Sequence, residues 1–285
     1  MSIRLEDVYY TYSKNTPFER QALAGVSLTM AKGEIVAVIG HTGSGKSTLV
    51  QHLNALLVPD KGGAFIDEID ITVKNPKAKA ARQQVGMVFQ YPEHQLFAET
   101  VFEDIAFGPR NKGFNEEQVL REVKDAMDFV GLDYDSFANR SPFQLSGGQM
   151  RRVAIAGVVA MAPDYLVLDE PSAGLDPRSR NAVFREIMSL HKKRGIAIVL
   201  VTHSMEEAVK YADRMLVVNR GRILFDGKPA SIFKEHADEL LEVGMDIPQV
   251  FKLAGLLKSR GLRLPEGLKD EVSLIAAIRK AKGWK

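Results

Sequence analysis

The stretch Ile35-Val36-Ala37-Val38-Ile39-Gly40-His41-Thr42-Gly43-Ser44-Gly45-Lys46-Ser47 determines the fold class of this chain. Its first five residues are apolar and mostly β-branched, which is typical of a strand buried on both faces of a parallel sheet. A glycine-rich turn follows, and Ser47–Leu57 then suits a helix. A glycine followed by four residues and Gly-Lys-Ser, between a strand and a helix, is the pattern of a phosphate-binding loop. The alternative is a glycine-rich turn that binds nothing, and the strand–turn–helix context argues against it.

The residues of this loop suit the triphosphate of ATP. Glycines let the backbone curl so that successive N–H groups point at phosphate oxygens, and the N-terminus of the following helix adds partial positive charge. We expect Lys46 to reach the β- and γ-phosphates, Ser47 to ligate Mg²⁺ and Thr48 to contact the α-phosphate. The loop residues expected to contact ATP are Gly40, His41, Thr42, Gly43, Ser44, Gly45, Lys46, Ser47 and Thr48.

Further apolar runs extend the pattern of alternating strands and helices. The other candidate strands are Val85–Phe89, Leu166–Leu168 and Ile196–Val201. The candidate helices between them are Glu116–Val130 and Arg178–Lys193. In the first of these helices the predicted apolar stripe consists of Leu120, Val123, Met127 and Val130. The alternation predicts an α/β fold with a mostly parallel core sheet.

The chain is expected to contain a large domain and a small C-terminal one. Residues near the start predict a β-rich N-terminal lobe, whereas residues 91–146 contain no convincing buried strand and predict a mostly helical subdomain. Arg222–Phe225 predicts one more short strand. From Pro229 onward, short helical segments are interrupted by glycine and proline. We therefore expect the main domain over residues 1–228 and a small helical domain over residues 229–285.

The composition limits the classes of protein to which the chain can belong. It has 285 residues and a formal net charge of +2, which is too mild to indicate nucleic-acid binding. It contains no cysteine, which excludes disulfides and thiolate chemistry. The N-terminus lacks the pattern of a signal peptide, and no apolar stretch reaches the ~18–20 residues that cross a bilayer. We expect a cytosolic protein that reaches the membrane only through a partner.

Two adjacent carboxylates follow the candidate strand that contains Leu166–Leu168. The carboxyl end of a strand in an open α/β sheet opens onto the ligand crevice, so Asp169 is expected to hold Mg²⁺ and Glu170 to act as the general base for an attacking water. Burying both acids without a cation would be costly. A solvated Asp-Glu turn would be the preferred interpretation if the pair stood alone, and the phosphate loop makes it unfavourable.

A second anion-binding pattern occurs at Leu145-Ser146-Gly147-Gly148-Gln149. A serine hydroxyl and two glycine N–H groups at the start of a helix can hold a phosphate. One chain needs only one cradle for a γ-phosphate, so a second cradle indicates that ATP lies between two subunits. The residues expected to contact ATP across that interface are Ser146, Gly147, Gly148 and Gln149.

With these motifs the chain resembles ABC ATPases, from about Ile3 to Gly227. The order of the motifs also matches that family: phosphate loop, Gln90, signature, acid pair, Ala173-Gly174-Leu175-Asp176 and His203. The resemblance implies that Gln90 links the metal and the water to a transmembrane partner, that Asp176 lies in the loop crossing the dimer interface and that His203 contacts the γ-phosphate. An isolated histidine in that place would be interpreted as structural.

The resemblance also places an aromatic residue against adenine. Tyr12 occupies that position, with Tyr9 and Tyr10 as nearby alternatives and a role in strand packing as the competing interpretation. The remaining histidines show no metal-ligand spacing and are interpreted as ordinary residues; these are His41, His52, His94, His191 and His236.

More closely, the chain resembles the ATPase subunits of energy-coupling factor transporters, which import vitamins and transition-metal ions. The stretches that carry this likeness are Pro17–Arg20, Phe89–Phe97, Asp104–Pro109 and Met245–Val250. The resemblance implies a second related ATPase, a transmembrane coupling protein, an indirectly bound substrate-binding membrane subunit and a place on the cytoplasmic face of the cell membrane. Within the family the chain looks closer to the second of the paired ATPases.

Three other functions remain as alternatives. An ABC exporter subunit shares the common motifs but not the likeness around Gln90 and in the tail. A soluble ABC ATPase acting on nucleic acid would need a long coiled coil or a second cassette, and the chain has neither. A non-hydrolytic ATP-binding regulator is disfavoured by Glu170.

Overall fold

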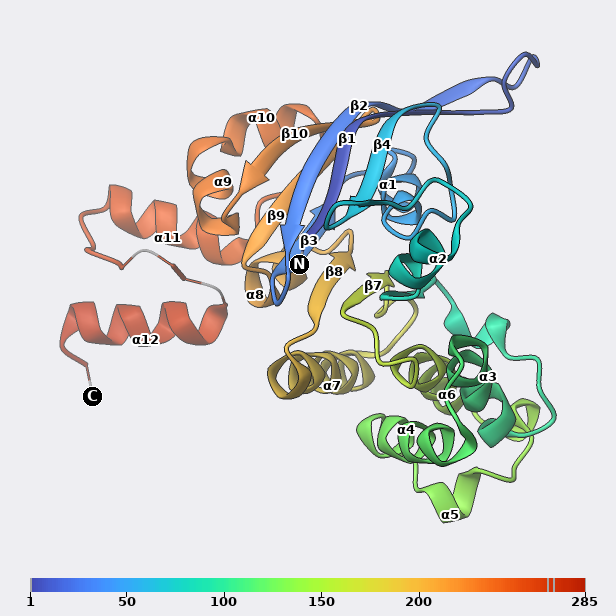
Figure 1. The fold of residues 1–285 in the computed structure, drawn as a ribbon. Helices are drawn as coiled ribbons and strands as arrows, with labels where there is room; N and C mark the ends of the chain where they lie inside the picture. Colours follow the sequence, from blue (N-terminus) through green and yellow to red (C-terminus); the bar gives the residue numbers. More distant parts are fainter. Residues whose placement is uncertain (1, 266, 269, 285) are drawn as a thin grey trace.

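Two β-sheets form the centre of the computed structural model, which describes residues 2–265, 267–268 and 270–284 (Figure 1). In the larger sheet the strand order is β10-β9-β3-β8-β7-β6. Strands β9, β3, β8, β7 and β6 run parallel to one another, and the edge strand β10 is antiparallel to β9. The bounds are β3 Ile35–Ile39, β6 Val85–Val88, β7 Tyr165–Asp169, β8 Ala197–Val201, β9 Arg214–Asn219 and β10 Arg222–Gly227. The predicted α/β fold with a mostly parallel core sheet is confirmed.

The smaller sheet is antiparallel and comes from the N-terminal part of the chain. Its strand order is β2-β1-β4-β5, with bounds β1 Ser2–Tyr12, β2 Arg20–Ala31, β4 Lys61–Ile66 and β5 Ile69–Asp70. It forms the expected β-rich lobe, and the turn of the long β1–β2 hairpin projects from the molecule (Figure 1).

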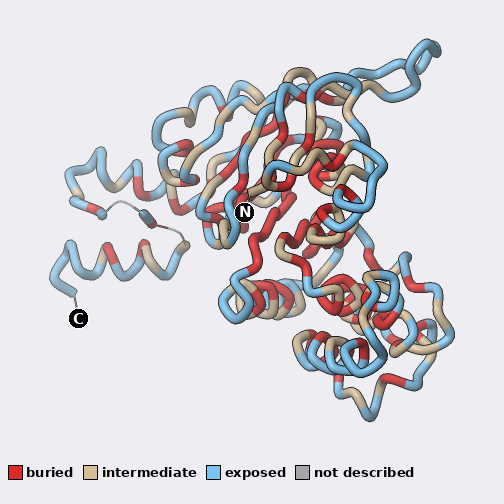
Figure 2. Tube along the Cα trace, in the orientation of Figure 1, coloured by how far each residue is buried: buried red, intermediate tan, exposed pale blue. Residues whose placement is uncertain are grey.

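Strand β3 shows why its sequence is apolar at every position. Successive side chains of a strand point to opposite faces. Ile35, Ala37 and Ile39 enter a core cluster shared with the helices, whereas Val36 and Val38 enter a second cluster shared with the smaller sheet and the helix after the phosphate loop. The strand is therefore covered on both faces (Figure 2).

The helices cover the core sheet and build the subdomain between β6 and β7. That subdomain has η1 Pro92–Gln95, α3 Val101–Lys112, α4 Glu116–Phe129, α5 Tyr134–Phe137, η2 Pro142–Gln144 and α6 Gly147–Val159. The remaining helices before residue 229 are α1 Lys46–His52, α2 Pro76–Arg82, α7 Pro177–Arg194 and α8 Met205–Tyr211. None of the described helices has the length and apolar character needed to cross a membrane.

Two predictions about helices were wrong. Helix α1 ends at His52 rather than at Leu57, because Ala55 has a left-handed backbone (φ 53°) and the Asn54 side chain accepts a hydrogen bond from the N–H of Leu56 at 3.1 Å. In α4, Leu120 is 39% exposed, and the buried stripe is Val119, Val123, Ala126 and Met127. The predicted stripe was therefore displaced by one residue at its first position.

The C-terminal residues form helices that belong to two separate cores. Their bounds are α9 Pro229–Glu235, α10 Ala237–Glu242, α11 Gln249–Ser259 and α12 Glu271–Lys282. Ile232, Phe233, Leu240 and Met245 join the main core cluster. Helices α11 and α12 instead share a small cluster of their own, which includes Val250, Ala254 and Leu274. The first part of the tail is thus packed onto the rest of the protein, and the second part has its own core and contacts the main core through Phe251, which stacks on Phe233.

His52 at the end of α1 gives a prediction about stability. It is fully buried, and its Nδ1 donates a hydrogen bond to the carbonyl of Thr48 at 2.7 Å. Burial lowers the pKa of His52, against the opposing effects of this hydrogen bond and of Asp60. The unfolded chain therefore binds more protons than the folded one below about pH 6.5, and folding stability falls as the pH drops through this range.

We expect His52→Gln to flatten that dependence. The glutamine amide can keep the bond to Thr48 but cannot take up a proton. Urea unfolding of both proteins at pH 7.5, 6.5 and 5.5 measures the effect, since other titrating groups are common to the two chains. Parallel pH profiles would contradict the assignment to His52.

Candidate functional site

Four loops meet at the carboxyl edge of the core sheet. They follow β3, β8, β7 and β6, which are four consecutive strands of the sheet. A cleft of about 290 Å³ lies between the β1–β2 hairpin and the loops after β3, β6 and β7, whereas His203, after β8, lines an adjacent hollow. The lining residues of the cleft are Tyr12, Arg20, Ala22, Thr42, Gly43, Gly45, Lys46, Ser47, Thr48, Gln90, Asp169 and Glu170. The structure therefore brings most of the predicted nucleotide and metal residues to one place.

The phosphate loop is held by close backbone packing. Gly45 has a φ of 109°, and a Cβ atom there would lie 2.6 Å from the carbonyl oxygen of Ala22, so this position needs glycine. Lys46 is buried, and its Nζ donates hydrogen bonds to the carbonyls of Gly40 at 2.8 Å and His41 at 2.9 Å. Burial lowers the pKa of Lys46, and the carboxylates of Glu170 and Asp169 oppose that shift.

Three loop residues lie outside the lining of the main cleft. Ser44 is buried, and its side chain lies against Gly40. Gly40 and His41 line an adjacent hollow together with His203 and the tail segment Gly244–Pro248. The Nε2 atom of His41 donates a hydrogen bond to the carbonyl of Val243 at 2.8 Å, which fastens the tail to the phosphate loop.

Tyr12 is the tyrosine that reaches the cleft. It is 38% exposed, and its hydroxyl lies 3.2 Å from the hydroxyl oxygen of Thr48. Tyr10 packs edge-on against the Tyr12 ring and against His52, and Tyr9 lies under the ammonium group of Lys61. Of the three tyrosines, the geometry favours Tyr12 as the platform for a base.

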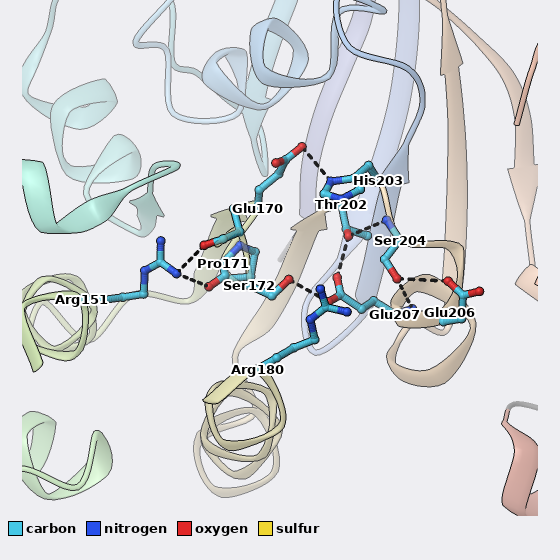
Figure 3. A network of polar contacts seen from close by, with 11 residues as sticks. Arg151, Glu170, Pro171, Ser172, Arg180, Thr202, His203, Ser204, Glu206 and Glu207 are labelled. Carbon is cyan, nitrogen blue, oxygen red and sulfur yellow. Dashed lines mark hydrogen bonds and ion pairs between the residues drawn. The ribbon is translucent and has the colours of Figure 1, made fainter. Parts of the chain in front are cut away.

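Glu170 contacts both other residues of the predicted catalytic group, and Figure 3 shows its contact with His203. Its Oε2 accepts a hydrogen bond from Nε2 of Gln90 at 3.1 Å, and its Oε1 lies 3.3 Å from Nδ1 of His203. Its backbone is left-handed (φ 49°) and is held by a hydrogen bond from its N–H to the carbonyl of Val201 at 2.9 Å. Such a conformation is uncommon for a residue with a Cβ and is often found at functional sites.

Asp169 is more deeply placed than its neighbour. It is 7% exposed, and burial raises the pKa of its carboxyl group, against the hydrogen bond from the Ser47 hydroxyl. A carboxylate in this setting is stabilised by a nearby cation.

The signature lies at the start of α6 and does not line the cleft described above. Ser146 caps the helix, since its Oγ accepts from the N–H of Gln149 at 3.3 Å while the Gln149 side chain accepts from the N–H of Ser146 at 3.0 Å. A Cβ atom placed on Gly147 or Gly148 would meet nothing within 4 Å. Packing within the described chain therefore does not require glycine at either position.

Asp176 caps α7 in a similar way. Its Oδ1 accepts hydrogen bonds from the backbone N–H groups of Arg178 at 2.9 Å and Ser179 at 3.1 Å. The hydrogen bond from the Ser179 hydroxyl is the main reason that the pKa of Asp176 is lowered. Within this chain its role is thus that of a helix cap.

Comparison with known proteins decides the family. A family model described as ABC transporter matches residues 23–173. The chain belongs to the ABC transporter family.

Among curated relatives, the energy-coupling factor transporter ATP-binding protein EcfA2 of Clostridium tetani is 52% identical, over 94% of this cassette chain and 93% of its own length. The protein of the same name from Caldanaerobacter subterraneus is 49% identical, over 93% of this chain and 92% of its own. The predicted membership of the ABC ATPases and the closer likeness to energy-coupling factor ATPases are confirmed.

Solved structures of other cassettes agree with the fold. The structure of cbiO1 from Clostridium perfringens, described as part of the ABC transporter complex cbiONQ, has a TM-score of 0.73 and 33% identity. It covers 89% of this chain and 98% of its own. A dimeric ATP-binding cassette in a post-hydrolysis state, bound to ADP and Pi, has a TM-score of 0.71 and 29% identity, covering 80% and 98%.

Two polar clusters of the cassette were missed by sequence reasoning. In the first, the buried carboxylate of Glu207 accepts hydrogen bonds from the hydroxyls of Ser172 at 2.7 Å and Thr202 at 2.6 Å, with Nε of Arg180 at 3.6 Å (Figure 3). It joins the loop after Glu170 to the loop that carries His203. Nothing local in the sequence distinguishes Glu207 from the exposed glutamate beside it.

The second cluster is centred on Arg151 of α6. The side chain is 4% exposed, and its Nε lies 3.2 Å from Oε2 of Glu93 in η1. Its Nη1 donates to the carbonyl of Ala173 at 2.9 Å and is 3.5 Å from that of Pro171 (Figure 3). The signature helix is thereby tied both to the segment after Gln90 and to the segment after Glu170.

Proposed function

We propose that this ABC ATPase powers an energy-coupling factor importer for vitamins or transition-metal ions, as one half of an ATPase dimer beneath a membrane coupling protein. The observation that carries hydrolysis is the contact of Glu170 with both Gln90 and His203 beside the phosphate loop. The importer class is supported by relatives about 50% identical over nearly the whole chain, which are themselves energy-coupling factor ATP-binding proteins.

The residues beside the phosphate loop fit Mg²⁺. The Ser47 hydroxyl and the buried Asp169 carboxylate are in hydrogen-bond contact, and Gln90 lines the same cleft. Mg²⁺ prefers such oxygen donors and completes its shell with phosphate oxygens and water. When bound, the ion neutralises charge that develops on the phosphates. Ser47, Gln90 and Asp169 are therefore its proposed protein ligands.

The chain's own groups would then bind and activate the reactants. Tyr12 would stack on adenine, and the phosphate loop with Lys46 would hold the phosphates. Glu170 would position water and accept its proton, while His203 would donate a hydrogen bond to the γ-phosphate. Gln90 would keep the Glu170 carboxylate oriented and would move with the adjoining helical subdomain when the site closes.

A second chain would complete the site. Ser146, Gly147, Gly148 and Gln149 would bind the γ-phosphate of the partner's nucleotide, and the loop at Asp176 would lie at the interface. The open space around Gly147 and Gly148 supports this role, because a molecule that approaches from outside would find the backbone accessible.

The surface that follows Gln90 suits a membrane partner. Leu96 is a core residue, whereas Phe97 is 60% exposed and packs edge-on against Phe107. Tyr91 is also exposed. We propose that this aromatic surface receives helices of the coupling protein and so places the chain on the cytoplasmic face of the membrane.

Nucleotide binding can be tested at Lys46. We expect Lys46→Ala to raise the Kd for Mg-ATP by about 10- to 100-fold, because a hydrogen bond from a charged group contributes about 1.5–3 kcal/mol. Lys112 offers a matched control: it too donates to backbone carbonyls, of Met161 and Ala162, and burial lowers its pKa as well, yet it does not line the cleft. Equal losses for Lys46→Ala and Lys112→Ala in a titration with fluorescent ATP would refute the assignment.

The importer class can be tested in the host membrane. Tagged chain is purified from detergent-solubilised membranes, and its partners are identified by mass spectrometry while Mg-ATPase activity is measured. A second related ATPase and a multi-span membrane protein are expected. Recovery of ribosomes or DNA, or of no membrane protein, would contradict the importer proposal but not the assignment as an ATPase.

A further inference from the structure

Arg20 occupies a position at the nucleotide cleft to which none of the motifs assigns a role. It is the first residue of β2 and pairs with Tyr12, the last residue of β1, across the hairpin. Both residues line the cleft. The hairpin therefore places an aromatic ring and a guanidinium group next to each other in the lining of the cleft.

The guanidinium lies at the phosphate loop. Its Nη2 donates a hydrogen bond to the carbonyl of Gly43 at 3.0 Å, and a Cβ atom on Gly43 would lie 2.9 Å from this nitrogen. Gly43 has a φ of 78° and stands in the middle of the loop. Tyr12, in contrast, contacts Thr48 in α1. Arg20 is thus directed at the part of the cleft where the phosphates bind.

The charge of Arg20 has no counter-ion within the described chain. No salt bridge within 4.0 Å joins Arg20 to a described carboxylate, and the side chain of the neighbouring Glu19 accepts a hydrogen bond from the N–H of Asn15. An arginine side chain has five N–H donors in a planar fork, and a single hydrogen bond to Gly43 is formed. Most of its donors are therefore available at the rim of an anion-binding cleft.

We propose that Arg20 binds the phosphate chain of the nucleotide while it fastens the phosphate loop at Gly43. Arginine suits this double role because its fork can bind a phosphate through one edge and a carbonyl through another. The inference rests on the proposed nucleotide site and adds one residue to it. The phosphate loop and Lys46 would bind the phosphates from one side of the cleft, and Arg20 would bind them from the β1–β2 hairpin on the other side.

The test measures the affinities of ADP and of uncharged adenosine for three variants at Arg20. Each unlabelled ligand displaces a fluorescent ADP from the protein. Arg20→Gln removes the charge but keeps an amide that can donate to Gly43, Arg20→Ala removes both, and Arg20→Lys keeps the charge. We expect Arg20→Gln to weaken ADP about five- to tenfold at low salt and less at high salt, with adenosine unchanged. Arg20→Lys should recover part of the loss.

A matched control is Lys14→Gln, which removes a positive charge from the same hairpin. Lys14 is paired with Asp60 and does not line the cleft, so ADP affinity should be unchanged. Wild-type ADP affinity in Arg20→Gln with a loss only in Arg20→Ala would show that Arg20 fastens the loop alone, and would overturn the proposal. A folded wild-type chain that binds no ADP would instead overturn the nucleotide site itself.

Discussion

Glu170→Gln is expected to lower ATP turnover by about 10²–10⁴-fold and to leave ATP binding close to that of the wild type, because a positioned base contributes a factor of that order. Glutamine has the same shape, so the contacts with Gln90 and His203 can persist. Its neutral amide cannot accept a proton from water. The loss should therefore appear in kcat, with little change in Kd.

The measurement uses the assembled complex, with phosphate release for turnover and fluorescent ATP for binding. Glu206→Gln is a suitable control, since Glu206 lines the hollow beside His203 but forms its hydrogen bond with Ser204. Its turnover should stay within about twofold of the wild type, as is usual for substitutions away from the reacting groups. If Glu170→Gln hydrolysed ATP at the wild-type rate, another residue would be the base.

Arg151→Met is expected to lower the free energy of unfolding by about 3 kcal/mol. Removing one partner of a buried ion pair leaves the other charge uncompensated, and here two backbone carbonyls also lose their donor. Methionine fills much of the same volume, so the effect reports on polar contacts more than on a cavity. The melting temperature should fall by roughly 5 °C, because the unfolding entropy of a chain of this length is about 0.6 kcal/mol/K.

Arg152→Met provides the comparison, because this adjacent arginine forms no salt bridge within 4.0 Å among the described residues. The double variant Glu93→Gln/Arg151→Met should lose less free energy of unfolding than the two single variants lose in sum, because it removes both charges of the pair. Additive effects would mean that the charges of Glu93 and Arg151 are not coupled, and equal losses at Arg151 and Arg152 would mean that the cluster contributes little.

The sequence was most informative where a local pattern corresponds directly to a physical requirement. The apolar run at Ile35–Ile39 and the following glycines specify a buried parallel strand and a phosphate loop, and both are present. The sequence also indicates that the polar residues that follow the core strands lie close together, because neighbouring parallel strands end at the same edge of a sheet. The roles proposed for those residues stay predictions.

The features that escaped prediction depend on distant contacts. Arg151 and Glu207 look like ordinary charged residues on amphipathic helices, and their partners are set by how α6 and α8 pack. Arg20 was noted only as part of a likeness. Leu120 shows a different difficulty: Val119 and Leu120 are both apolar, so the sequence pattern allows either at the buried face, and the packing of α4 buries Val119 and leaves Leu120 exposed.

The hydrogen bond between His41 and Val243 also affects where a chimaera of this chain and a related protein should be joined. A chimaera joined at residue 228 would replace the segment whose backbone carbonyl holds the phosphate loop, together with the buried side chains of Leu240 and Met245. A junction after Pro248 keeps these contacts and exchanges α11 and α12, which have a core of their own and contact the main core through Phe251. The natural crossover point therefore lies some twenty residues beyond the last strand of the sheet.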